Sequence, residues 1–136
     1  MPTTPTAVFA QLPKSNTAVV TTATAALATD APTGTVLLVT AGVNGCIVTR
    51  LTAMPRATML STALYSFTSP DGGVTQRLKD SETMAGQTIG TGTRIDEIPF
   101  GNYSEARPMR LGPNERLYVG TGIAANIVFA AEWTDF

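Results

Sequence analysis

Residues 41–55 read AGVNGCIVTRLTAMP, and this stretch indicates the kind of fold. Asn44-Gly45 favours a tight turn, because both residue types tolerate the positive φ that such turns require. From Cys46 to Met54 two sets of side chains alternate with the period of two that is typical of a strand, and Pro55 ends the run. We predict a strand over residues 35–40, a hairpin loop over 41–45 and a return strand over 46–54.

Similar signals predict further strands over residues 18–24, 61–69, 74–78, 107–111, 115–121 and 126–133. Residues 94–100 fit a short strand or an extended connection. Residues 69–73 predict a tight turn, and residues 112–114 predict a second hairpin loop. Residues 79–86 are the only plausible short helical turn.

About eight short strands with almost no helix exclude parallel βαβ units, which need helical crossovers. The sequence therefore predicts an all-β fold, an antiparallel β-sandwich of about eight strands, most naturally with jelly-roll topology. An immunoglobulin-like sandwich is the alternative, although it would usually show paired cysteines.

The 136 residues fit a single domain. Residues 1–16 contain Pro2, Pro5 and Pro13 and show little periodicity, so we interpret them as an extended N-terminal arm, with a frayed terminus as the alternative. Residues 17–136 form the predicted β-sandwich domain. No segment has the features of a signal peptide or approaches the ~20 apolar residues of a membrane-spanning helix, so we expect no membrane partner.

Charged residues are scarce: they make up 14% of the chain, against about 25% in an average soluble domain. The formal net charge is −1, and no basic stripe is present, so we expect no nucleic-acid partner. A surface with so little charge is well suited to docking against another protein.

Catalytic chemistry is poorly supported, because the chain has no histidine and one cysteine, Cys46. Ser-His-Asp and Cys-His arrangements and histidine metal sites are therefore excluded. A pair of carboxylates from distant segments would remain possible in principle. We expect no enzyme activity and no catalytic, cofactor-binding or metal-binding residues.

Arginine and tryptophan are the side chains that protein interfaces favour most strongly. The alternative for the arginines is an ordinary solvated strand position, and for the tryptophan a place in the core. The interface candidates are Arg50, Arg56, Arg107, Arg110 and Trp133.

Three stretches together, Val43–Arg56, Leu64–Leu78 and Leu111–Gly122, carry a family resemblance. They resemble the head decoration, or capsid cement, proteins that tailed bacteriophages encode beside the major capsid protein. The resemblance covers residues 35–133 and implies a jelly-roll fold. It also implies synthesis in the host cytoplasm and a place on the outer surface of the capsid, where copies bridge and stabilise neighbouring major capsid protein subunits. Association with itself, as a homodimer or homotrimer, is implied in the same way.

A different class of function stays open beside this one. Jelly rolls also serve as carbohydrate-binding or host-attachment modules of phage fibres, and such a module would need an exposed aromatic platform.

Overall fold

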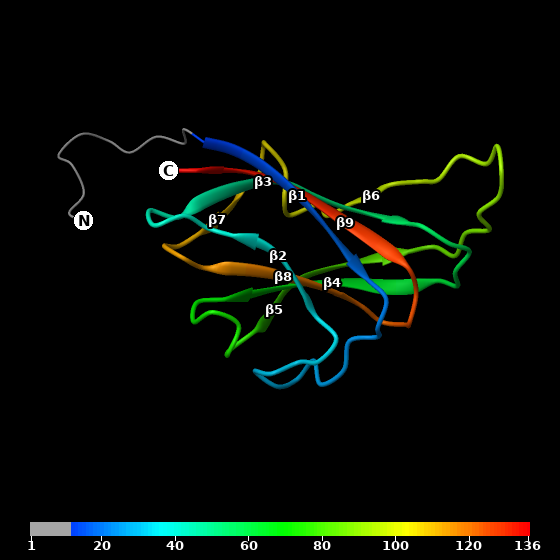
Figure 1. Cartoon of the computed structure of the whole chain (residues 1–136), viewed down its shortest axis with the longest axis horizontal. Helices are drawn as coiled ribbons and strands as arrows, with labels where there is room; N and C mark the ends of the chain where they lie inside the picture. The colour runs from blue at the N-terminus through cyan, green and yellow to red at the C-terminus, as the bar shows by residue number, and fades with distance from the viewer. Residues whose placement is uncertain (1–11) are drawn as a thin grey trace.

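The computed structural model describes residues 12–136, which form nine strands and no helix, arranged as two facing antiparallel sheets (Figure 1). The strands are β1 (Leu12–Val20), β2 (Val36–Thr40), β3 (Cys46–Pro55), β4 (Thr62–Ser69), β5 (Arg77–Met84), β6 (Ile98–Pro99), β7 (Met109–Leu111), β8 (Arg116–Thr121) and β9 (Ile127–Asp135). Sheet A has the order β1-β9-β3-β6, with β7 also paired to β3, and sheet B has the order β2-β8-β4-β5. The predicted all-β sandwich is confirmed. Within these residues no helix could cross a membrane.

The strands pair in a nested order. β1 pairs with β9, β2 with β8, β4 with β5, and β3 with both β6 and β7, which act as two pieces of one interrupted strand. Rolling such a nest of antiparallel pairs into two sheets gives the jelly roll, and this is the topology that the sequence predicted.

Both predicted hairpin loops join the two sheets and do not form hairpins. Residues 41–45 connect β2 of sheet B to β3 of sheet A, and residues 112–114 connect β7 of sheet A to β8 of sheet B. The turn chemistry itself is as expected: Gly45 has φ 85° and Asn114 has φ 59°. The Asn114 N–H donates to the Gly42 carbonyl at 3.0 Å, so the two connections lie together at one end of the sandwich.

The helical turn predicted for residues 79–86 is wrong, because most of this segment belongs to strand β5. β5 pairs with β4 along the edge of sheet B, and Ser69–Gly73 makes the expected tight turn between them. β5 carries charged side chains on an exposed edge, where they oppose pairing with another chain. The same polar composition hid the strand pattern in the sequence.

β1 begins earlier than predicted, at Leu12, so residues 12–16 of the predicted arm belong to a strand that pairs with β9. Pro13 is tolerated there because β1 is an edge strand of sheet A. The rest of the predicted arm, residues 1–11, lies outside the described residues.

One extra residue interrupts the alternation of β3. Val48 pairs with Trp133 and Arg50 pairs with Glu132, so Thr49 forms a bulge between them. Before the bulge Cys46 and Val48 are buried, and after it the buried positions shift to Leu51 and Ala53. The unbroken alternation that we predicted for residues 46–54 is therefore wrong.

The core fills the space between the sheets with apolar side chains from both. Its largest fully buried members are Phe100, Phe129, Leu38, Leu51, Leu64, Met84, Leu117 and Ile127.

The two long sides of the sandwich are closed differently. On the β1–β2 side, the Asn16 side-chain amide donates to the Leu38 carbonyl at 3.0 Å. On the other side the β6–β7 connection inserts Tyr103, whose hydroxyl lies 2.9 Å from the Ser66 hydroxyl of sheet B. Nearby, Asn102 donates to Asp80 at 2.9 Å.

The outer face of sheet B is covered by the chain itself. Phe67 and Tyr118 are paired on that face, outside the main core, yet Phe67 is fully buried. The linker over residues 21–35, at the bottom of Figure 1, crosses the sheet to cover them. Thr24 donates to the Thr121 carbonyl at 2.8 Å, and at the far edge Asp30 pairs with Arg77 at 3.0 Å.

The single thiol of the chain should be inert while the protein is folded. Cys46 is fully buried, and burial followed by the nearby Asp135 carboxylate raises its pKa from 9.0 to about 12. Ellman's reagent at pH 8 should label almost no thiol in the native protein and one thiol per chain in guanidinium chloride, because only the thiolate reacts. Rapid labelling of the native protein would contradict this placement.

Tyr103 should make stability depend on pH in the alkaline range. Burial raises its pKa from 10.0 to about 12, so the unfolded chain loses this proton first as the pH rises. The contribution of the buried, neutral Tyr103 to the free energy of unfolding is present in full below pH 10 and is lost as the pH rises from 10 towards 12. Urea denaturation across this range should show a shallower loss of stability for Tyr103→Phe than for the wild type, once the cost of the lost hydrogen bond, about 1 kcal/mol, is subtracted at pH 7.

Candidate functional site

The outer face of sheet A, unlike that of sheet B, is not covered by any other described segment. We call it the open face, and the strand register arranges its side chains in four rows across the sheet. From one end to the other the rows are Pro13, Thr134, Ile47 and Arg110; Ser15, Glu132 and Arg50; Thr17, Ala130 and Thr52; and Val19, Val128 and Met54. The open face therefore passes from a polar end, through small side chains, to an apolar end.

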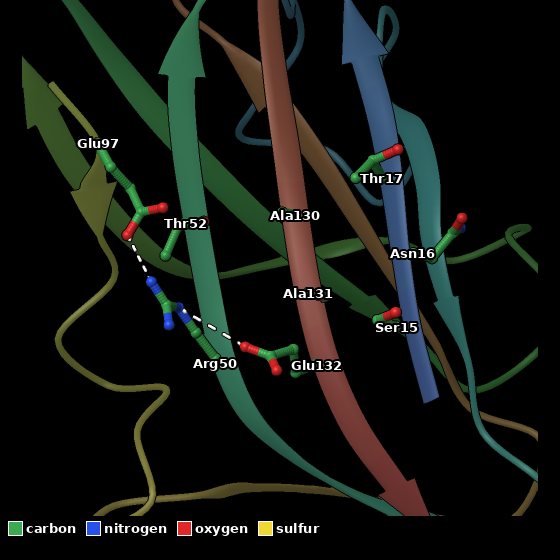
Figure 2. A pocket seen from close by; sticks show the side chains of 9 residues that line it. All are labelled: Ser15, Asn16, Thr17, Arg50, Thr52, Glu97, Ala130, Ala131 and Glu132. Carbon is green, nitrogen blue, oxygen red and sulfur yellow. Dashed lines mark hydrogen bonds and ion pairs between the residues drawn. The ribbon is translucent and has the colours of Figure 1, made fainter. Parts of the chain in front are cut away.

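Arg50 is the centre of the polar end. Its guanidinium donates to the Glu97 carboxylate at 2.7 Å and lies 3.7 Å from the Glu132 carboxylate, as Figure 2 shows. Glu97 raises the pKa of Arg50 above its ordinary value, chiefly through this hydrogen bond. One guanidinium thus serves two carboxylates, and about half of its side chain stays exposed.

The bulge at Thr49 explains why Arg50 points outward. Without the extra residue, Arg50 would follow Val48 in phase and point into the core. Burial of an unpaired guanidinium costs far more than an exposed ion pair returns, so the bulge is required for this sequence to form the sheet.

A shallow hollow of about 590 Å³ lies on the open face beside this cluster. Ala130 and Thr52, which pair between β9 and β3, have small side chains and form its floor. Figure 2 shows both positions beside the Arg50 cluster. Its lining residues are Ser15, Asn16, Thr17, Arg50, Thr52, Glu97, Ala130, Ala131 and Glu132.

A second hollow, of about 650 Å³, adjoins the first across the Arg50 cluster. It runs from Thr49 to the β6–β7 connection and is lined there by Pro99, Tyr103 and Glu105. The Arg50, Glu97 and Glu132 side chains line both hollows, so they form a polar ridge between two depressions.

A third hollow, of about 620 Å³, lies among the connections that follow β3, β5 and β8. Its lining residues carry no charge, and Leu60 at its rim is 79% exposed.

The structure separates the predicted interface residues. Arg50 and Arg110 both lie on the open face, and the Arg110 guanidinium sits 6.0 Å from the centre of the Phe136 ring. Arg56 and Arg107 are exposed in connections outside the sheets. Trp133 points into the sandwich with 7% of its surface exposed, which is the core position given as its alternative.

Sequence reasoning missed most of the open face. Glu97 and Glu132 lie 47 and 82 residues from Arg50 in the chain, and only the strand pairing brings them together. No local signal could find them. Ala130 and Thr52 were missed because small residues carry no chemical signature, although their pairing across β3 and β9 forms the hollow.

The chemistry of the open face suits binding. Its hydroxyl groups, from Ser15, Thr17 and Thr52, have no histidine to activate them, since the chain contains none. Among residues 12–136, no three His, Cys, Asp or Glu side chains are placed to hold a metal ion. The face offers instead an ion cluster, a floor of small side chains and an apolar strip.

Comparison with known proteins adds little to this description. No protein-family model matches the chain, and no curated protein does. A solved structure of infectious bursal disease virus, Gx strain, is similar with a TM-score of 0.26 and 10% sequence identity. That match covers 98% of this chain and 45% of the viral chain, so this chain spans less than half of its length. A similarity at this TM-score carries no argument about the function of this protein.

Proposed function

We propose that this chain is a structural virion protein that binds the outer surface of a phage capsid and bridges neighbouring major capsid protein subunits. The observation that carries the proposal is the contrast between its two sheets. The linker of residues 21–35 covers sheet B, whereas sheet A presents the open face, with a hollow floored by Ala130 and Thr52. The capsid as partner comes from the resemblance of Val43–Arg56 and the two other stretches to decoration proteins.

The composition of the open face fits a flat protein partner. Its floor is uncharged, so docking there requires little desolvation of ions. The Arg50 cluster lies at one end, where it can exchange one of its carboxylate partners for a carboxylate of the capsid. Arginine supports such contacts because its planar fork holds a carboxylate through two hydrogen bonds.

The proposed mechanism is thermodynamic linkage. A protein that binds the assembled shell and not its dissociated subunits stabilises the shell by mass action. Because a capsid repeats the same site many times, a bridging protein engages two subunits at once, and modest contacts combine through avidity.

Carbohydrate binding is less well supported by the arrangement of aromatic side chains. Phe67, Tyr103 and Trp133 are buried in this chain, so none of them provides a platform on which a sugar ring could stack. Binding of the isolated domain to a glycan array, without binding to capsids, would favour this function over the one proposed.

The test is cosedimentation of the purified protein with empty capsids assembled from the major capsid protein of the same genome. Wild-type protein should pellet with capsids in a saturable way. Ala130→Arg should weaken binding at least ~10-fold, which corresponds to about 1.4 kcal/mol, because a long charged side chain fills the hollow.

The matched control is Leu60→Arg, which places the same side chain at the rim of the third hollow and should leave binding unchanged. Failure of the wild-type protein to sediment with capsids would overturn the proposal. Equal loss of binding in Ala130→Arg and Leu60→Arg would show that the open face is not the capsid-binding surface.

Arg50→Met should separate binding from stability. Exposed ion pairs contribute little to folding, so the thermal unfolding midpoint should stay within experimental error of the wild type. Capsid binding should weaken and should lose part of its dependence on salt concentration, which the titration of binding against sodium chloride will show. Unchanged binding with unchanged salt dependence would show that the cluster does not contact the capsid.

A further inference from the structure

The apolar end of the open face has no covering segment among the described residues. Val19, Val128 and Met54 stand side by side there, because β9 pairs with β1 on one side and with β3 on the other. Val19 is 38% exposed, and the other two side chains are half-buried. An apolar row of this kind, next to a hollow floored by small side chains, is typical of a surface that another segment covers.

The chain carries a segment of matching chemistry before β1. Residues 1–11 contain no charged side chain, and residues 7–10 read Ala-Val-Phe-Ala, an apolar run. A charged segment would lose its hydration on this row without finding a partner, whereas an uncharged apolar one buries surface at little cost.

We propose that residues 7–10 of one copy of this chain lie on the Val19–Val128–Met54 row of a second copy. The exchange makes the protein a homo-oligomer, with residues 7–10 of each copy held by a neighbouring copy.

Chain length is the reason for a second copy. Val8 is four residues from Leu12, so it can lie at most about 14 Å from it, at up to ~3.6 Å per residue. Along β1, Leu12 and Val19 are seven residues apart, or about 23 Å at ~3.3 Å per residue. Within its own chain, the Val8–Phe9 pair therefore reaches the rows of Pro13 and Ser15 at the polar end of the open face and stops short of the Val19 row.

Each copy has one such segment and one open face, so the exchange closes as a two-fold dimer or as a ring. The apolar row is separate from the Arg50 cluster, which leaves the polar end of the face free for the capsid contact proposed above. The inference does not depend on that contact, since it concerns the protein in solution. Self-association without capsid binding, or the reverse, would separate the two proposals.

The first test is sedimentation velocity of the full chain over a range of concentrations. The wild type should form a defined oligomer, and Phe9→Asp and Val19→Asp should each shift it to the monomer mass. Val43→Asp is the matched control: Val43 is 74% exposed in the β2–β3 connection, away from the row, and this variant should stay oligomeric. A monomeric wild type would overturn the proposal, and so would an oligomer that Phe9→Asp and Val19→Asp both leave intact.

A cross-linking test reports the contact directly and does not depend on oligomer mass. Purified Phe9→Cys and Val19→Cys chains are mixed and oxidised under mild conditions, with one chain carrying a mass tag. Cys46 is buried and does not compete. A disulfide-linked dimer of one tagged and one untagged chain is expected, and Phe9→Cys mixed with Val43→Cys should give none. Absence of the first product, or equal yield of both, would overturn the proposal.

Discussion

The single extra residue in β3 is the constraint on which the open face depends. Thr49 bulges between the pairs Val48–Trp133 and Arg50–Glu132 and reverses the phase of the strand that follows. Leu51 and Ala53 then enter the core, while Arg50 and Thr52 line the hollow on the open face. A shift of one residue would exchange these two sets, and the energetic cost of a buried guanidinium makes that alternative inaccessible. The ion cluster and the floor of the hollow are therefore set by one local irregularity.

Much of the fold was predictable because it depends on local patterns. The strands around residues 36–40, 62–69, 116–121 and 127–135 follow from β-branched and alternating residues, and the count of strands led to the jelly roll. The two errors about hairpin loops share one cause. Gly45 and Asn114 adopt positive φ whether a chain turns back within a sheet or crosses to the other sheet, so turn chemistry could not tell these cases apart.

The candidate site was predictable only in part. Arg50 was identified from residue type alone, but its partners Glu97 and Glu132 come from distant strands. β5 was predicted too early, over residues 74–78, and its remainder was predicted as a helical turn because an exposed edge strand carries charged residues that mimic one. In each case the missing information was the register of pairing between segments far apart in the chain, which a single sequence does not encode in any short window.

The nested pairing has a consequence for the kinetics of the molecule. Its outermost pair joins β1 to β9, so the two ends of the described chain must meet before sheet A is complete. Closing so large a loop costs entropy that local contacts cannot offset, which places jelly rolls among the slower-folding small domains. The same long-range pairs must break together for the domain to open, so we expect the native state to persist long after folding. Such persistence suits the structural role that we propose for this protein, in which a copy is assembled once and is not replaced.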